Sequence, residues 1–307
     1  MTGPRLAILG PTASGKSALA MAVATSEAGR RQGVELLSVD AMQVYRGMDI
    51  GTAKPSSQDQ SRVRHHLIDV VDASQSFTVA QFQVESERAM RDIESRGGTP
   101  LFVGGTGLYL RAVIDDLDIP GQWPKVRSRL EHELASVGPE GLHRRLVELD
   151  PTAASKMEPT NGRRVVRALE VCEGSGRPFS SFGPGVDTYP DTVVRQVALQ
   201  WDRKVLAQRI ERRVHDMIGR GLLDEVTGLM ARGMSRTALQ ALGYKEMVDH
   251  LEGQASLDEA VATTIRRTRQ FAVRQERWFR RDPRIEWMPV EDDPVSEVAP
   301  ALVGSLT

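Results

Sequence analysis

Cysteine is almost absent from this chain of 307 residues, because Cys172 is the only one. A single thiol excludes an internal disulfide and a zinc site built from several cysteines. The sequence also has no apolar run long enough to cross a bilayer, and no basic start followed by an apolar stretch of the kind that directs secretion. We therefore expect a cytoplasmic protein that has no membrane partner. We also expect a monomer, although no sequence pattern indicates the oligomeric state.

A strong net charge is the second absence. The 40 Lys and Arg residues nearly balance the 41 Asp and Glu residues, and the formal net charge is −1. A nucleic-acid-binding surface would therefore need a local concentration of basic residues. The length suggests about two domains.

A glycine-rich stretch near the start, GPTASGKS, matches the phosphate-binding pattern G-x-x-x-x-G-K-[ST]. It follows an apolar strand expected at 5–9 and precedes a helix expected from Lys16 to about Ala28. In such a loop the backbone N–H groups and the helix N-terminus bind phosphate, the lysine adds a charge, and Ser17 is placed to bind Mg²⁺. The predicted diphosphate-binding residues are Gly10, Pro11, Thr12, Ala13, Ser14, Gly15, Lys16 and Ser17.

The acidic residue that nucleotide-hydrolysing enzymes need at a second strand end is missing. The strand expected at Leu101–Val103 runs into the glycine turn GGTG, where Thr106 is the first polar side chain. The acid at a strand end near the start of the chain is Asp40, after the strand expected at 34–39. This pattern argues against hydrolysis of a nucleotide. It favours a transfer reaction in which phosphate is the leaving group or the substrate.

Asp40 and Thr106 each allow two interpretations. Asp40 could cap a turn or order a water on Mg²⁺, or it could accept a proton from a nucleophile across from the phosphate loop. Thr106 could cap the next helix, or the glycines around it could allow another group to approach the backbone. We favour the functional interpretation for both.

Strands that alternate with helices up to residue 118 predict an α/β fold, with a P-loop NTPase-like parallel sheet flanked by helices. Further strands are expected at 66–71 and 192–201, and a helix at 76–97 with Ser76 or Thr78 as its N-cap. Residues 125–172 suggest helices only. We expect an α/β core at 1–118, a helical insertion at 119–190, a return to the core with C-terminal helices at 191–284, and a loosely held acidic tail at 285–307.

Several further motifs occur in an order that resembles the tRNA dimethylallyltransferases. They are GPTASGKS, SVDAMQVYRGMDIGTAKP at 38–55, HHLIDVVD at 65–72, FVGGTGLY at 102–109, NGRRVVRALEV at 161–171 and ALGYKE at 241–246. The resemblance extends to about Arg281. It implies transfer of a dimethylallyl group from dimethylallyl diphosphate to N6 of adenosine 37, in tRNAs that read codons beginning with U, with release of diphosphate.

The resemblance also implies roles for individual residues. Asp40 matches the family's base, Thr106 its contact to the reacting centre, and Arg213 an arginine that clamps the diphosphate, although Arg209 and Arg212 are neighbouring candidates. The tRNA contacts expected from the strand-end segment, the insertion and a C-terminal helix are Asp40, Ala41, Met42, Gln43, Thr106, Arg127, Arg163, Arg164, Arg167 and Arg274. Two positions depart from the family pattern, because Ala41 replaces a frequent Ser and Arg163 a frequent Gln.

Basic residues are concentrated in the segment 264–284. Helical spacing places Ile265, Ala272 and Phe279 on one side, and Arg267, Arg274 and Arg281 on the other. This pattern is typical of a helix that faces RNA, although a merely solvated face has the same charge pattern. Together with the insertion arginines, it could hold a tRNA anticodon stem–loop from two sides.

Three other functions remain open from the residues. A small-molecule kinase would use the same loop with ATP, and a related prenyltransferase would use free adenine nucleotides. An RNA-binding module without catalysis would not need Lys16 and Ser17 at their positions in the phosphate-loop motif. The missing strand-end acid, the insertion and the basic helix favour an RNA-modifying prenyltransferase.

Overall fold

The chain forms two compact units in a computed structural model that describes residues 5–183 and 185–306. The core unit consists of the segments before Asp116 and after Thr188, and the insertion unit is Asp116–Thr188. Each unit has its own core of buried apolar side chains.

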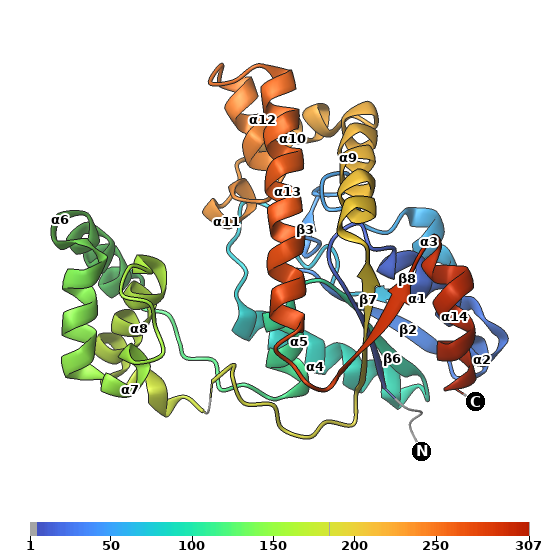
Figure 1. The fold of residues 1–307 in the computed structure, drawn as a ribbon, viewed down its shortest axis with the longest axis horizontal. Coiled ribbons are helices and arrows are strands. Elements are labelled where there is room, and N and C mark those ends of the chain that lie inside the picture. Colours follow the sequence, from blue (N-terminus) through green and yellow to red (C-terminus); the bar gives the residue numbers. More distant parts are fainter. Residues whose placement is uncertain (1–4, 184, 307) are drawn as a thin grey trace. The chain divides into compact units, whose positions relative to one another are not determined.

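The core is built on a six-stranded, fully parallel sheet with the order β4-β2-β6-β1-β7-β8. This confirms the α/β fold class with a parallel sheet flanked by helices (Figure 1). Its strands are β1 (Leu6–Leu9), β2 (Val34–Val39), β4 (His65–His66), β6 (Thr99–Gly104), β7 (Arg195–Trp201) and β8 (Ile285–Val290). A separate pair of short parallel strands consists of β3 (Tyr45–Arg46) and β5 (Val71–Asp72).

Both faces of the sheet are covered, which explains why the central strand β1 is apolar along its whole length. Along β1, Ala7 and Leu9 join one apolar cluster with Phe82 of α4 (Val79–Ser95), whereas Ile8 joins the other with Leu302 of α14 (Pro294–Gly304). The flanking helices are α1 (Lys16–Thr25), α2 (Glu27–Arg31), α3 (Ser57–Arg62), α4 (Val79–Ser95), α5 (Gly107–Ile114) and α14 (Pro294–Gly304).

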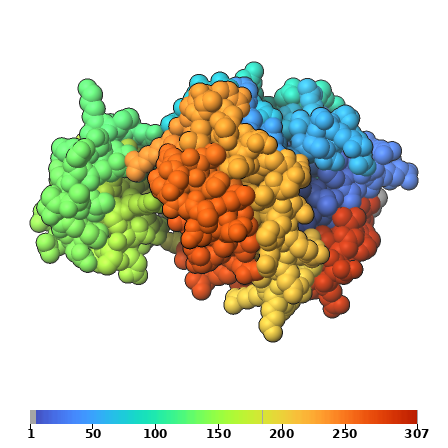
Figure 2. Space-filling model, turned by 90° about the horizontal axis from the view of Figure 1, so that it is seen from above, coloured from blue at the N-terminus to red at the C-terminus, as the bar shows by residue number. Residues whose placement is uncertain are grey.

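The segment after β7 forms a group of helices whose surfaces are continuous in Figure 2. They are α9 (Arg203–Gly219), α10 (Leu222–Arg232), α11 (Arg236–Leu239), α12 (Tyr244–Leu251) and α13 (Leu257–Phe279). Helix α13 contacts α9 and α12, and its C-terminal half also reaches α5 (Figure 1). Its predicted apolar face is confirmed, because Ile265, Ala272 and Phe279 are all buried. No helix in the described part of the chain has the length and apolar character needed to span a membrane.

The insertion unit is helical. It contains α6 (Pro124–Leu149), α7 (Pro151–Ala154), α8 (Gly162–Ser175) and the 3-10 turn η1 (Phe179–Ser181). Helix α6 is interrupted at Gly138, whose φ of 71° is non-helical. Apolar residues of α6 and α8, including Leu142 and Leu169, pack into a small core of this unit.

Two expected elements differ from the structure. The helix that begins at Lys16 ends at Thr25, because Ser26 adopts an extended conformation and caps the separate α2 through its side chain. The single strand expected at 66–71 is instead two short strands in different sheets. Leu67 and Asp69 have positive φ values of 64° and 54°, which a continuous strand cannot contain.

The expectation of a loosely held acidic tail is wrong. Residues 285–290 form β8, the edge strand of the main sheet, and α14 packs against α1. Two acidic side chains have structural roles here, because the Glu297 carboxylate accepts backbone N–H bonds from residues 291–293 and the Asp293 carboxylate caps α14. The local charge therefore concealed an amphipathic helix whose Val298 and Leu302 are buried.

Because Leu302 is fully buried, we expect Leu302→Ala to lower the free energy of unfolding by about 2–5 kcal/mol. Urea titration followed by circular dichroism measures this change. The exposed neighbour Ala301 supplies the control, because Ala301→Ser should stay within about 0.5 kcal/mol of the unmodified protein. A Leu302→Ala protein that unfolds like the control would mean that the tail is not part of the core.

Candidate functional site

The expected site residues lie at the carboxyl ends of three adjacent strands, β2, β6 and β1. Gly104 is in register with both Leu9 and Val39, so the residues that follow these strands begin at the same level of the sheet. The carboxyl edge of a parallel sheet is where such folds bind ligands. The topology thus brings together the phosphate loop, Asp40 and the turn that contains Thr106.

The phosphate loop is fixed from several sides. Gly15 has a φ of 88°, which favours glycine, and it precedes the first residue of α1. The Trp201 indole N–H donates to the Ser14 carbonyl at 2.9 Å, and Arg209 Nε donates to the Ala13 carbonyl at 3.0 Å. The buried Ser14 hydroxyl has no hydrogen-bond partner within the described structure. A braced loop with an unpartnered hydroxyl fits an anionic ligand.

Two cations, Lys16 and Arg213, interact electrostatically at this loop. Lys16 Nζ donates to the Pro11 carbonyl at 3.2 Å, and neither Lys16 nor Arg213 has an ion pair among the residues that the structure describes. Burial, and next the nearby Arg213 charge, lower the pKa of Lys16 to about 8, while the Asp40 charge opposes this change. Burial also lowers the pKa of Arg213, again opposed by Asp40. Both cations are shielded from water and repel each other. A ligand with several negative charges would therefore stabilise both.

The three neighbouring arginines of α9 have different surroundings. Arg213 is partly buried and interacts electrostatically with Lys16 and Asp40. Arg209 holds the loop backbone and stacks on the Trp201 ring at 4.2 Å. Arg212 is exposed. This arrangement favours Arg213 as the residue that contacts the ligand and gives Arg209 a bracing role.

Asp40 and Thr106 are connected through the backbone between them. The Met42 N–H donates to Asp40 Oδ1 at 2.9 Å, so one carboxylate oxygen does cap its own turn. The Thr106 hydroxyl accepts from the Ala41 N–H at 3.2 Å, and it makes no capping bond to α5. The second oxygen of Asp40 has no hydrogen bond within the described residues, which leaves it available to accept a proton.

The other two members of the strand-end segment differ in their exposure. Ala41 and Met42 are partly exposed, whereas Gln43 is buried. The Gln43 amide accepts from the Ser38 hydroxyl at 2.7 Å and donates to the carbonyls of Thr52 and Ala53. The Gln43 side chain therefore supports the segment from inside the core.

Gln275 of α13 is a site residue that the sequence analysis missed. Its amide accepts from the Thr12 N–H at 2.8 Å and donates to the Gly105 carbonyl at 2.9 Å. The available signal was helical spacing, because Gln275 lies three residues after Ala272 and four before Phe279. It is thus a polar residue on the face that the pattern already assigned to the core.

The residues present fit a magnesium ion only in part. Ser17 is exposed, and its hydroxyl has no hydrogen bond within the described residues. The described residues contain no group of three His, Cys, Asp or Glu side chains that could hold a metal by themselves. Ser17 would therefore supply a single protein ligand, and a bound Mg²⁺ would take its other ligands from phosphate oxygens and water.

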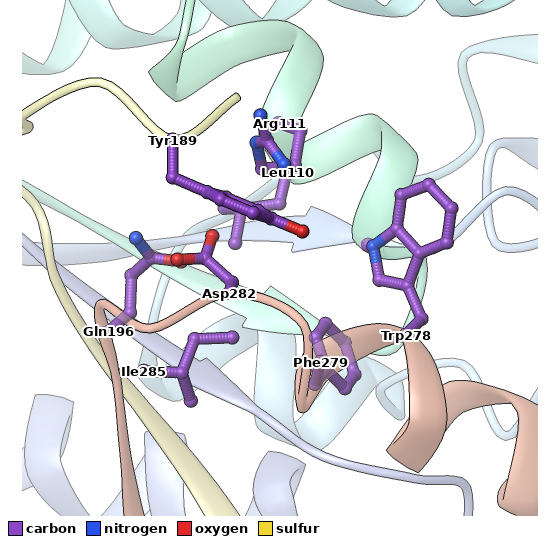
Figure 3. Close-up of a pocket in the computed structure, with 9 residues that line it drawn as sticks. Leu110, Arg111, Tyr189, Gln196, Trp278, Phe279, Asp282 and Ile285 are labelled. Carbon is purple, nitrogen blue, oxygen red and sulfur yellow. The ribbon is translucent and has the colours of Figure 1, made fainter. Parts of the chain in front are cut away.

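A small cavity elsewhere in the core is not a ligand site. Its volume is about 10 Å³, and Arg111, Tyr189, Gln196 and Asp282 are among the residues that line it (Figure 3). The Arg111 guanidinium stacks on the Tyr189 ring at 4.5 Å. Both amide atoms of Gln196 are buried and lack hydrogen-bond partners. This space is large enough for one water molecule and for no larger ligand.

Fewer arginines of the segment 264–284 are available to bind RNA than the sequence suggests. Arg267, Arg269, Arg280 and Arg284 form ion pairs with carboxylates. The arginines that remain exposed and have no ion pair within the described residues are Arg266, Arg274, Arg277 and Arg281. They are the residues of this segment that are available to phosphate groups.

In the insertion unit, Arg163 and Arg164 are exposed at the start of α8. Arg127 and Arg167 instead both pair with Glu170, whose carboxylate is almost fully buried, and Glu170 also accepts the Trp123 N–H. The four expected tRNA contacts of this unit therefore divide into two available arginines and two that already have a carboxylate partner.

Comparison with known proteins identifies the family. The family described as IPP transferase matches residues 43–282. The chain belongs to the IPP transferase family. A tRNA dimethylallyltransferase of Kineococcus radiotolerans is 50% identical over 94% of this chain and 92% of its own. A tRNA dimethylallyltransferase of Thermobifida fusca is 46% identical over 97% of this chain and 93% of its own.

Solved structures of IPP transferases agree with the fold. The full-length tRNA isopentenylpyrophosphate transferase of Bacillus halodurans has a TM-score of 0.70 and 39% identity, covering 99% of this chain and 97% of its own. A eukaryotic dimethylallyltransferase acting on tRNA has a TM-score of 0.79 and 27% identity, covering 97% and 77%. The expected family is thereby confirmed over nearly the whole chain.

If Arg213 is the residue that contacts the diphosphate, Arg213→Met should weaken binding of dimethylallyl diphosphate, measured calorimetrically without tRNA. We expect a loss of about 10- to 100-fold, because a hydrogen bond to a charged group is removed. Arg212→Met is the matched control, with the same change in charge at an exposed position, and it should alter the affinity by less than about threefold. Equal losses in the two variants would count against the assignment.

Proposed function

We propose that Lys16, Arg213 and the phosphate loop hold the diphosphate of a prenyl donor while Asp40 deprotonates an adenine amine. The enzyme is a tRNA dimethylallyltransferase that modifies adenosine 37 with dimethylallyl diphosphate as donor. The observation that carries the proposed residue roles is the pair of desolvated cations without ion-pair partners, next to a carboxylate at the neighbouring strand end.

The leaving group receives most of the stabilisation. As the allylic C–O bond breaks, its electron pair stays on the diphosphate, and positive charge develops on the dimethylallyl carbon. Lys16, Arg213 and the N-terminus of α1 stabilise the negative charge that accumulates on the departing oxygens. Mg²⁺ bound at Ser17 would add a further positive charge to the same group.

The nucleophile is weak, because the lone pair of the exocyclic adenine nitrogen is conjugated with the ring. The lone pair of N6 forms the new C–N bond, and the N6 proton moves to the available oxygen of Asp40. Thr106 fixes this geometry by binding the Ala41 N–H next to Asp40. The products are N6-(dimethylallyl)adenosine and free diphosphate.

Adenosine 37 must leave its stack to reach Asp40. We assign the holding of the anticodon stem–loop to exposed arginines on both units: Arg274 and its free neighbours on α13, and Arg163 and Arg164 on α8. tRNAs that read codons beginning with U are the proposed substrates. Because Arg163 replaces a frequent Gln, we expect a contact to phosphate or guanine at that position.

Asp40→Asn tests the base. With labelled dimethylallyl diphosphate, Mg²⁺ and unmodified tRNA, the unmodified enzyme should label the RNA and release diphosphate. The variant should bind tRNA normally but lose about 10²- to 10⁴-fold in rate, because an amide cannot accept the proton.

Parallel reactions with AMP as acceptor, or with ATP and no prenyl donor, should give no product. An Asp40→Asn enzyme with unchanged turnover would remove Asp40 as the base, and labelled AMP would indicate a different acceptor.

Arg274→Ala tests the RNA-facing helix. Loss of the Arg274 charge should weaken tRNA binding. It should also reduce the slope of log affinity against log salt concentration by about one. Filter binding at several salt concentrations measures both quantities. Arg91→Ala, which removes an exposed arginine of α4, should change neither. If the two variants behave alike, α13 does not bind the RNA specifically.

A further inference from the structure

Gln275 connects three elements that lie far apart in the sequence. It is a buried residue of α13, with 7% of its surface exposed. Its side-chain carbonyl accepts from Thr12 in the phosphate loop after β1, and its NH₂ group donates to Gly105 in the turn after β6. One amide therefore satisfies a donor of one loop and an acceptor of the other, and neither contact can be replaced by water in a buried place.

Side chains of α13 lie close to the backbone of the turn that contains Gly105. A Cβ atom at Gly105 would lie 2.2 Å from Nε2 of Gln275, and one at Gly107 would lie 2.0 Å from Nε1 of Trp278. Any larger residue at Gly105 or Gly107 would have to displace the side chain of Gln275 or Trp278. The group that approaches the backbone at these two positions is the protein's own helix.

The two loops that Gln275 joins carry opposite halves of the reaction. Thr12 belongs to the loop that contains Lys16, which holds the leaving group. Gly105 precedes Thr106, whose hydroxyl binds the Ala41 N–H beside Asp40. We propose that Gln275 is a positioning residue that sets the separation between the diphosphate and the base. This inference rests on the proposed roles of the phosphate loop and Asp40.

The location on α13 adds a consequence for RNA binding. Arg274, the preceding residue, is exposed, whereas Gln275 is buried. Two adjacent residues of α13 therefore have different surroundings. Arg274 is available to tRNA, and Gln275 contacts the phosphate loop and the turn after β6. A change at Gln275 should alter the chemical step without altering the RNA-binding surface.

The test is single-turnover transfer from saturating dimethylallyl diphosphate to bound tRNA by the full-length enzyme, with tRNA affinity measured separately. Gln275→Met keeps the side-chain size but loses both hydrogen bonds. We expect its rate to fall about 100-fold, because a displacement of about 1 Å between reacting groups has an effect of this size. The dissociation constant for tRNA should stay within about threefold, since the exposed arginines are unchanged.

Gln196→Met is the matched control, because both of its amide atoms are buried and unpartnered. Its rate should stay within about twofold of the unmodified enzyme. Rates are compared at a temperature at which circular dichroism shows every variant folded. If Gln275→Met does not fold, Gln275→Glu replaces it: its carboxylate still accepts from Thr12 but cannot donate to Gly105, so its rate should also fall while tRNA affinity is retained.

A folded Gln275→Met enzyme with a rate close to that of the control would overturn the positioning role. The same holds if the loss disappears once the unfolded fraction is subtracted, because Gln275 would then serve stability alone. Failure of the unmodified enzyme to transfer the prenyl group would instead contradict the proposed function, so the two failures are distinguishable.

Discussion

Two positive charges held close together without an ion-pair partner are the constraint on which the site depends. Lys16 and Arg213 repel each other at the end of β1, and burial makes both charges costly. Such an arrangement is unfavourable in the free protein and becomes favourable when a multiply charged anion enters. The stabilisation increases further as negative charge develops on a departing diphosphate, which is the condition for faster chemistry.

The rest of the core keeps this arrangement in place. Parallel strands set the phosphate loop, Asp40 and Thr106 at one edge, and contacts from distant segments fix the loop between them. Trp201 and Arg209 hold its carbonyls, and Gln275 holds one of its N–H groups. The bracing side chains come from β7, α9 and α13, so the C-terminal half of the chain is needed for a site whose motif lies near the start.

Much of the fold and the phosphate loop could be predicted from short-range patterns in the sequence, whereas Arg213 was expected from the family resemblance alone. The loop motif, the apolar strands and the amphipathic face of α13 are all local signals. What could not be predicted depends on tertiary partners. The pairing of Arg127 and Arg167 with buried Glu170, and the buried amide of Gln43, have no local signature. The acidic tail was misassigned because its charges conceal the buried Val298 and Leu302 of α14.

The most direct test of the paired cations is the proton balance of donor binding. Dimethylallyl diphosphate is titrated calorimetrically into the enzyme at pH 8, without tRNA, in buffers of different ionisation enthalpy. Because burial and the Arg213 charge lower the pKa of Lys16 to about 8 and a bound anion raises it, binding should take up a fraction of a proton, and Lys16→Met should take up less. Binding with no proton uptake by the unmodified enzyme, or with the same uptake by Lys16→Met, would contradict this account of the site.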